Sequence, residues 1–227
     1  TLFSFGFFTD GLKQHLVFMY DYVRVIKEGI KSGNFSAFRY DIGLGADFFV
    51  SYSFYSLFDP LTLIAYLIPL KYIEFSYYLI AILRLYLAGI FIILLAKRFK
   101  IKKVSSLLAV SLFYVFNSSI LFTAFRHPMF INGPMLLPLV ILGTEKVFNK
   151  ESSWLLILAS FLGLITQFYF FIYTSFAFEL YIIIRLLFNR EKGQFKKTIK
   201  GFISINLLYC LGVFIGGFVL IHQLLAT

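Results

Sequence analysis

Residues 73–96 read IEFSYYLIAILRLYLAGIFIILLA, and residues 97–103 continue as KRFKIKK. The first stretch is long and apolar enough for one helix to cross the roughly 30 Å hydrocarbon core of a bilayer. The second carries five basic residues in seven, and Lys and Arg are enriched in cytoplasmic connections. The stretch therefore predicts a membrane-spanning helix whose C-terminal end lies in the cytoplasm.

The composition extends this prediction to the whole chain. Hydrophobic residues make up 60% and charged residues only 14%, whereas soluble domains carry about a quarter of charged residues. A net charge of +10 would favour a nucleic-acid partner in a soluble protein. Here the basic residues cluster in short connections beside apolar runs, where they set orientation. We therefore expect an all-α polytopic membrane protein that is surrounded by membrane lipids and binds no nucleic acid.

Further spans are expected on the C-terminal side of residue 103, about six in all. Residues 152–188 would form a helix of about 55 Å, so we expect two spans with a break near Thr166-Gln167-Phe168-Tyr169. The other expected spans are residues 104–122, 130–148 and 201–225. With connections 97–103, 145–151 and 185–200 inside, 13 of the 21 basic residues are cytoplasmic and residues 1–57 lie outside.

The part before residue 73 has a different character. Apolar residues recur every three or four positions from Leu12 to Lys31, which predicts an amphipathic helix that ends at Ser32-Gly33-Asn34. Residues 58–70 would span only about 20 Å, so they are expected to form a re-entrant or interfacial helix. We predict a first extracytoplasmic loop over residues 1–72 and a helix bundle over 73–227, with both ends of the bundle truncated in this sequence.

Metal and cofactor sites are not indicated. The chain has one cysteine, Cys210, and its three histidines show neither i, i+4 spacing nor an HExxH pattern. We expect no cofactor and no protein-bound metal, although a divalent ion bound with the substrate stays open.

Asp10 is the first candidate for chemistry, with Lys13, Gln14 and His15 within one helical turn. An ionisable side chain at the rim of a membrane protein is a functional candidate, because such positions are costly. An Asp just before an amphipathic helix also accepts backbone N–H bonds as an N-cap. The sequence leaves catalysis and capping open, and the two roles do not exclude each other.

Three other places carry charge near the membrane. Asp41 and Asp47 flank a Gly43-Leu44-Gly45 turn that either contacts substrate or is an ordinary outer turn. Arg84, in the middle of the span over 73–96, either pairs with a buried carboxylate such as Glu179 or holds a lipid phosphate.

Arg126 and His127 stand at the outer end of the span over 104–122. Guanidinium binds phosphate oxygens bidentately, so this pair suits a phosphate or pyrophosphate. The alternative is an arginine that snorkels to lipid headgroups.

The pattern resembles the YfhO-like bacterial membrane proteins, which look like members of the GT-C superfamily of polyprenyl-phosphate-sugar-dependent glycosyltransferases. The matching residues extend in order over most of residues 8–188. They are Asp10 with Gln14, Gly43-Leu44-Gly45, Phe58-Asp59-Pro60, Arg126-His127-Pro128-Met129-Phe130-Ile131-Asn132, residues 138–146 and Gln167-Phe168-Tyr169-Phe170. The pattern departs at Asp59, where a small residue such as Ser is expected.

The resemblance implies a GT-C-like bundle in the bacterial plasma membrane, with its active site on the extracytoplasmic side. It implies an acidic catalytic residue after the first membrane helix, here Asp10, a lipid-linked sugar donor on undecaprenyl phosphate, and an envelope polymer such as teichoic or lipoteichoic acid as acceptor. Such a transfer needs a base for the acceptor hydroxyl and a cation for the departing phosphate. Asp10 is the expected base in an inverting displacement.

The expected substrate-binding residues are Gln14, His15, Asp41, Asp47, Arg84, Arg126 and His127. One alternative is a transporter or flippase of lipid-linked or envelope substrates, with Arg84, Glu179 and the break near Gln167 along a substrate path. Another is a noncatalytic scaffold for envelope synthesis. A transporter should show inverted internal repeats, and no convincing repeat is visible in the sequence.

Overall fold

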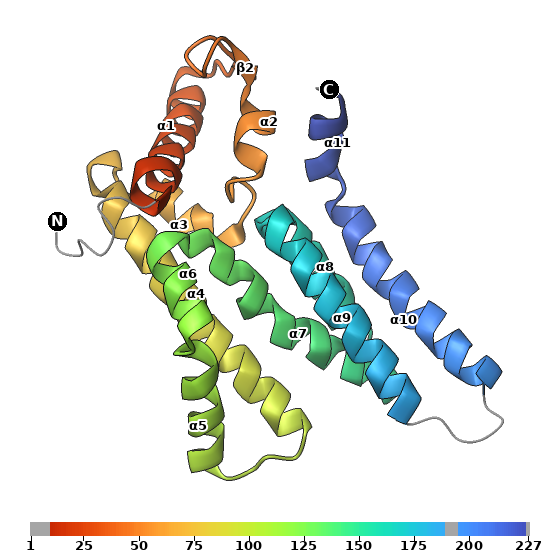
Figure 1. The fold of residues 1–227 in the computed structure, drawn as a ribbon. Coiled ribbons are helices and arrows are strands. Elements are labelled where there is room, and N and C mark those ends of the chain that lie inside the picture. Colours follow the sequence, from red (N-terminus) through yellow and green to blue (C-terminus); the bar gives the residue numbers. More distant parts are fainter. Residues whose placement is uncertain (1–9, 189–194, 226–227) are drawn as a thin grey trace.

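A computed structural model describes residues 10–188 and 195–225, which form a bundle of helices with a smaller layer of short helices at one end (Figure 1). The helical elements, with η marking short 3₁₀ or π turns, are η1 (Gly11–His15), α1 (Leu16–Ser32), α2 (Phe48–Ser53), η2 (Pro60–Thr62), α3 (Leu63–Leu67), η3 (Leu70–Tyr72), α4 (Ile73–Arg98), α5 (Val104–Val115), α6 (Ser118–Arg126), η4 (Pro128–Ile131), α7 (Asn132–Phe148), α8 (Trp154–Thr166), α9 (Phe168–Phe188), α10 (Phe195–Gly216) and α11 (Phe218–Leu225). The described strands, β1 (Phe38–Arg39) and β2 (Ala46–Asp47), pair antiparallel. The prediction of an all-α membrane protein is confirmed.

Four helices in the described part of the chain are long and apolar enough to cross a membrane, and they are Leu70–Arg98, Pro128–Phe148, Phe168–Phe188 and Thr198–Gly216. A bent pair, α5 with most of α6, raises the number to five if it counts as one span. The sixth expected span would be α8, which has 13 residues and reaches only about 20 Å. The number of about six spans stays a prediction.

The span expected over residues 104–122 is bent rather than one straight helix. The chain bends by 55° between α5 and α6. The side chain of Asn117 accepts a hydrogen bond from the backbone N–H of Ile120 at 3.0 Å, so it caps a new helix. A polar capping residue in an apolar run therefore divides one expected span into two helices.

The break expected near Gln167 is confirmed. Gln167 has extended backbone (φ −167°, ψ 100°), which ends α8. Its side-chain Oε1 accepts a hydrogen bond from the N–H of Phe170, in the first turn of α9. The span expected over residues 201–225 is found with other bounds, because the candidate span within α10 is Thr198–Gly216 and α11 follows as a separate helix.

The expected amphipathic helix is confirmed as η1 followed by α1. Gly33, with φ 69°, ends it in the left-handed conformation that glycine adopts without a steric penalty. Residues 58–70 are too short to cross a membrane, as expected, but they form η2 and the five-residue α3 rather than one helix. The β1–β2 hairpin was not predicted.

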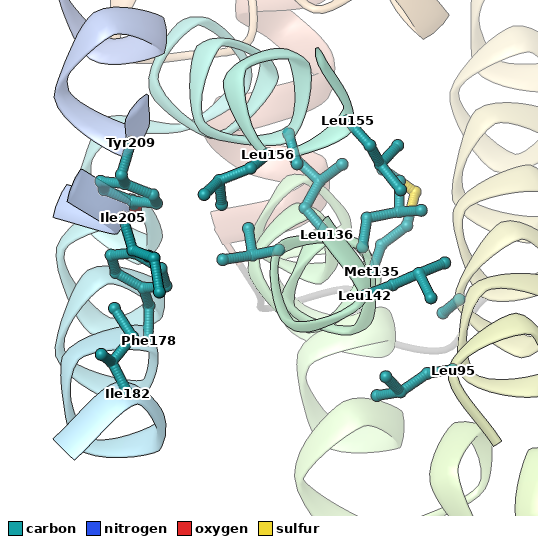
Figure 2. Packing of buried hydrophobic residues seen from close by; sticks show 14 of the residues in the cluster. Leu95, Met135, Leu136, Leu142, Leu155, Leu156, Phe178, Ile182, Ile205 and Tyr209 are labelled. Carbon is teal, nitrogen blue, oxygen red and sulfur yellow. The ribbon is translucent and has the colours of Figure 1, made fainter. Parts of the chain in front are cut away.

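Two groups of buried side chains hold the fold together. Figure 2 shows the larger one, in which Leu136 of α7 and Leu156 of α8 lie among side chains of α4, α9 and α10. In the same core the ring of Phe178 stacks on Tyr209, with centroids 4.1 Å apart. The second group joins α1, α2 and α3 to the first half of α4 through residues such as Tyr22 and Phe48. The helix α4 therefore links the bundle to the N-terminal layer, and a domain division at residue 72 stays a prediction.

The basic connections gather at one end of the bundle. The α4–α5 turn lies at the same end as the last turn of α9 and the first turn of α10 (Figure 1). Arg98 brings the α7–α8 turn to this end as well, because its Nη2 lies 2.6 Å from Glu151 Oε1. The start of α1 and the end of α6 lie at the opposite end (Figure 1). This arrangement agrees with a topology that separates residues 10–57 from all three basic connections.

Candidate functional site

Asp10 and His127 meet at the end of the bundle opposite the basic connections. The Oδ2 atom of Asp10 lies 4.0 Å from Nε2 of His127, and the Asp10 side chain is 66% exposed. Although Asp10 stands at the start of η1, its side chain accepts no capping hydrogen bond from the described residues. The N-cap interpretation is therefore wrong, and the carboxylate is accessible to a ligand.

Gly11 allows η1 to approach the end of α6 closely enough for Asp10 to lie near His127. A Cβ atom at this position would lie 2.7 Å from the carbonyl oxygen of Arg126, which is closer than real Cβ contacts. Residues 126 and 127 end α6, where the N–H of His127 donates to the carbonyl of Thr123 before Pro128 starts η4. Because Gly11 has no side chain, η1 can lie directly on the end of α6.

His15 lies beneath this contact and is 3% exposed. Its ring lies against Tyr55, His127 and Phe130, with the His127 ring centroid 5.3 Å away. Its Nδ1 finds no hydrogen-bond partner within the described chain. Burial and, to a smaller extent, the neighbouring His127 lower the pKa of His15 to about 4, while Asp10 opposes the shift. His15 is therefore neutral near pH 7.

This shift predicts a pH-dependent stability. Because the folded pKa of about 4 lies below the ordinary value of 6.5, neutral His15 contributes stability fully above pH 6.5, and the contribution is lost as the pH falls toward 4. We expect the free energy of unfolding to fall by about 2 kcal/mol from this group between pH 7 and pH 5. Denaturation of the purified wild-type protein and of His15→Gln between pH 7 and pH 5 measures this change in the free energy of unfolding. An equal pH dependence in both proteins would contradict the assignment.

Gln14 and Arg126 are the other expected ligands near Asp10. The Nε2 of Gln14 donates to the hydroxyl of Tyr55 at 3.1 Å. Arg126 is exposed, and its guanidinium carbon lies 4.8 Å from the ring centroid of Phe122. Arg126 makes no ion pair with any residue in the described part of the chain, so its charge is open to an anion from solvent or membrane. The structure brings Asp10, Gln14, His15, Arg126 and His127 together.

Arg84 has a partner other than the expected one. Its Nη2 lies 2.6 Å from Oδ2 of Asp59, and the two side chains are only 4% and 1% exposed. Glu179 instead accepts a hydrogen bond from Asn206 at 3.5 Å. The expectation of a buried ion pair is thus confirmed in kind, but the predicted partner Glu179 is wrong.

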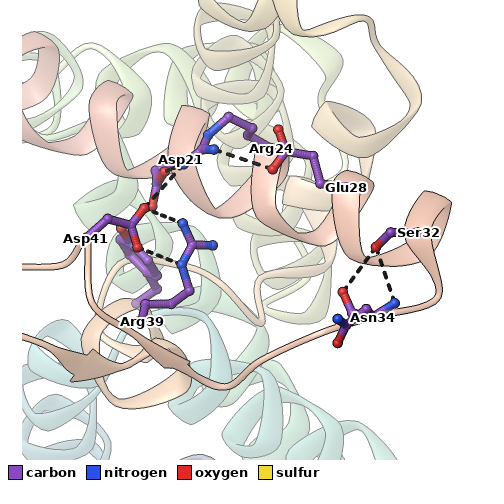
Figure 3. Close-up of polar contacts among 8 residues, drawn as sticks. Asp21, Arg24, Glu28, Ser32, Asn34, Arg39 and Asp41 are labelled. Atoms are coloured by element: carbon purple, nitrogen blue, oxygen red, sulfur yellow. Dashed lines mark hydrogen bonds and ion pairs between the residues drawn. The ribbon is translucent and has the colours of Figure 1, made fainter.

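Asp41 and Asp47 do not join the Asp10 cluster. Asp41 pairs with Arg39 and lies 3.8 Å from Arg24 of α1, in the polar network of Figure 3. The Arg39 hydrogen bond lowers the pKa of Asp41. Asp47 caps α2 by accepting the N–H of Val50 at 3.0 Å. Arg24 lies in the middle of α1, 14 residues beyond Asp10 and about 20 Å along the helix, so Asp41 stands well away from Asp10.

An apolar cavity of about 290 Å³ opens beside Gly11, between η1, α4, α6 and η4. Its walls include Gly11, Leu12, Ala81, Leu121 and Pro128. They offer almost no polar surface, so the cavity suits a hydrocarbon chain rather than a sugar or a peptide.

Sequence reasoning missed Asp59 and Asn132 as site neighbours. Asp59 is 2% exposed and Asn132 is 1% exposed, and both stand in apolar surroundings. Polar residues within apolar segments are the signal that would have found them. Among residues 10–188 and 195–225, no group of three His, Cys, Asp or Glu side chains is placed to hold a metal ion. The expectation of no metal cofactor stays a prediction.

Residues 4–227 match the family model described as "Bacterial membrane protein YfhO". No curated protein and no solved structure matches the chain.

Proposed function

Because the chain belongs to the YfhO family of bacterial membrane proteins, we propose that it transfers a sugar from a lipid-linked donor, undecaprenyl phosphate, to an extracytoplasmic envelope polymer. A teichoic or lipoteichoic acid hydroxyl is the proposed acceptor. The observation that carries this proposal is the exposed Asp10 carboxylate beside His127, next to an apolar cavity lined by Gly11. A carboxylate for the acceptor proton and an apolar groove for the lipid are parts that such a transfer needs.

Asp10 is the proposed general base. The acceptor oxygen forms a bond to the anomeric carbon of the sugar, while the bond from that carbon to the phosphate oxygen breaks. The hydroxyl proton passes to the Asp10 carboxylate, and the bonding electron pair leaves with undecaprenyl phosphate. Base assistance of this kind contributes roughly 10²- to 10⁴-fold to a rate. Direct displacement inverts the configuration at the anomeric carbon.

Arg126 and His127 are the proposed partners of the donor phosphate. Arg126 presents its guanidinium over Phe122 at the surface, and His127 stacks on Phe130 with ring centroids 4.9 Å apart. A positive charge fixed next to the leaving phosphate stabilises the negative charge that develops there. Buried, neutral His15 supports the His127 ring from below.

The apolar cavity is the proposed groove for the isoprenoid chain of the donor. Leu12 and Leu121 line it, and Gly11, which also lines it, is next to Asp10 in the chain. A lipid that enters here from the bilayer brings its phosphate toward the residues at the end of α6. The volume of about 290 Å³ holds only the first part of a long prenyl chain, so the rest would extend into the membrane.

The transporter alternative receives less support. It requires Arg84, Glu179 and the break at Gln167 to line a common substrate path. Arg84 is instead bonded to Asp59, and Glu179 lies near Asn206 of α10. Arg84 and Glu179 thus each have another partner, and no contact joins them in the described part of the chain.

Purified full-length protein in phospholipid vesicles tests the proposal. Undecaprenyl phosphate carrying a labelled sugar is added with and without lipoteichoic acid, and both released undecaprenyl phosphate and labelled polymer are measured. Transfer that depends on the acceptor is expected. Movement of the donor across the vesicle bilayer, without cleavage of the sugar bond, would support a flippase instead.

Gly11→Ala gives a test of the geometry. The added methyl would meet the Arg126 carbonyl and push η1 away from α6. We expect transfer to fall about tenfold or more, because small displacements of a catalytic group are costly. Gly43→Ala is the control, since it adds the same methyl group in an open turn (φ 58°) where nothing lies within 4 Å of the added atom. Equal transfer by both variants would show that this contact does not position Asp10.

A further inference from the structure

A buried polar network lies directly under the candidate site. Oδ2 of Asp59 accepts hydrogen bonds from Nη2 of Arg84 at 2.6 Å and from Nδ2 of Asn132 at 2.8 Å. Its Oδ1 accepts the backbone N–H of Leu61 at 2.9 Å. The Asp59 carboxylate is thus held by three donors from three different parts of the chain.

The network holds both ends of η4. Arg84 donates from Nη1 to the carbonyl of Pro128, the first residue of η4, at 3.3 Å. Asn132, directly after η4, binds the same Asp59 carboxylate. Between these two fixed points lies Phe130, whose ring stacks under His127. The position of His127 therefore depends on η4, which Asp59 holds directly at Asn132 and through Arg84 at Pro128.

Stability alone does not explain this arrangement. Removing two charges from water is costly, and well-packed apolar residues often replace a buried ion pair without loss of stability. The pair also brings no net charge to the site. Its distinctive property is geometric, because it fixes η4 relative to η2 and α4.

We propose that Asp59 and Arg84 are positioning residues, which hold η4 in place and thereby keep His127 within reach of Asp10. This inference rests on the proposed function for its catalytic consequence, while its geometric content concerns the distance between Asp10 and His127. The departure at Asp59 from the expected small residue is explained by the ion pair that it makes with Arg84.

The test separates stability from positioning with paired substitutions. Asp59→Leu and Arg84→Met alone each leave one buried charge without its partner, so both variants are expected to have a lower melting temperature. The double variant removes both charges, so its melting temperature is expected to return to near the wild-type value. Its transfer activity is expected to stay about 100-fold below wild type, because η4 is no longer fixed.

A second ion pair, in which Glu145 is buried and Arg185 is 34% exposed, supplies the control. Arg185 Nε lies 2.8 Å from Glu145 Oε1 at the opposite end of the bundle. The double variant Glu145→Leu/Arg185→Met removes the same chemical groups, and its activity per folded molecule is expected to stay near wild type. Equal activity in the two double variants would overturn the proposal.

A cross-linking measurement makes the outcome independent of activity. Asp10→Cys and His127→Cys are combined with Cys210→Ser, and a short bifunctional thiol reagent joins the two cysteines. We expect the yield to fall several-fold when Asp59→Leu/Arg84→Met is added, and to stay unchanged with the Glu145/Arg185 pair. A wild-type yield in the Asp59/Arg84 background would show that the network does not position His127.

Asn132→Leu keeps the measurement decisive if the double variant does not fold. It removes one donor to Asp59 and leaves the ion pair intact. A lower cross-linking yield is expected, and an unchanged yield contradicts the proposal. If the wild-type protein transfers no sugar while the cross-linking results hold, the proposed function fails and the positioning role stands.

Discussion

Replacing Asp10 with Asn is expected to lower kcat for sugar transfer by about 10³-fold, with little change in KM for the donor lipid. Asn has the size of Asp but cannot take the proton of the acceptor hydroxyl, and loss of a general base costs roughly 10²- to 10⁴-fold. The KM for the donor should be preserved because the apolar cavity and Arg126 are left intact. Initial rates in vesicles, at varied donor concentration, measure both quantities.

Two further variants show whether this effect is specific. Asp10→Glu keeps a carboxylate and should retain part of the activity. Glu28 lies farther along α1, and its side chain is 61% exposed. Glu28→Gln therefore neutralises another exposed carboxylate and should have no effect on transfer. A small effect of Asp10→Asn, comparable to that of Glu28→Gln, would exclude Asp10 as the base.

Replacing Arg126 with Gln is expected to lower kcat by about 100-fold. The guanidinium is exposed over the Phe122 ring and makes no ion pair within the described chain, so its charge is available for the departing phosphate. Removing one group that stabilises developing negative charge typically costs about 10²- to 10³-fold. Transfer rates of Arg126→Gln and wild type, measured in the same vesicles, give the effect.

Arg126→Lys and the melting temperature distinguish a phosphate ligand from a residue that snorkels to headgroups. Lys keeps the charge but not the bidentate geometry, so partial activity is expected. A snorkelling arginine predicts instead that Arg126→Gln lowers the melting temperature in vesicles while kcat stays unchanged. That result would remove Arg126 from the site.

Much of the fold could be predicted because its main signals are local. The basic connections, the long apolar runs and the break at Gln167 each depend on neighbouring residues. The break at Asn117 was harder to predict, because one polar residue in an apolar run is also compatible with a continuous helix. The structure shows that this side chain caps α6.

The candidate site could be predicted only where its parts are close in sequence or carry a recognisable charge. Asp10 and His127 were both predicted, but their proximity depends on the missing side chain at Gly11. The partner of Arg84 was predicted wrongly, since apolar periodicity does not indicate which carboxylate a buried arginine reaches. Asp41 was grouped with Asp10 because both belong to the same loop, yet the length of α1 keeps them apart.

The most direct measurement of the central claim uses bacteria that lack their own copy of the full-length protein. Wild-type protein or Asp10→Asn is expressed to equal levels in the membrane, and sugar on the envelope polymers is measured by mass spectrometry. We predict that wild-type protein restores the modification and that Asp10→Asn leaves the polymers bare. Wild-type levels of sugar with Asp10→Asn would contradict the claim that Asp10 is the base of a sugar transferase.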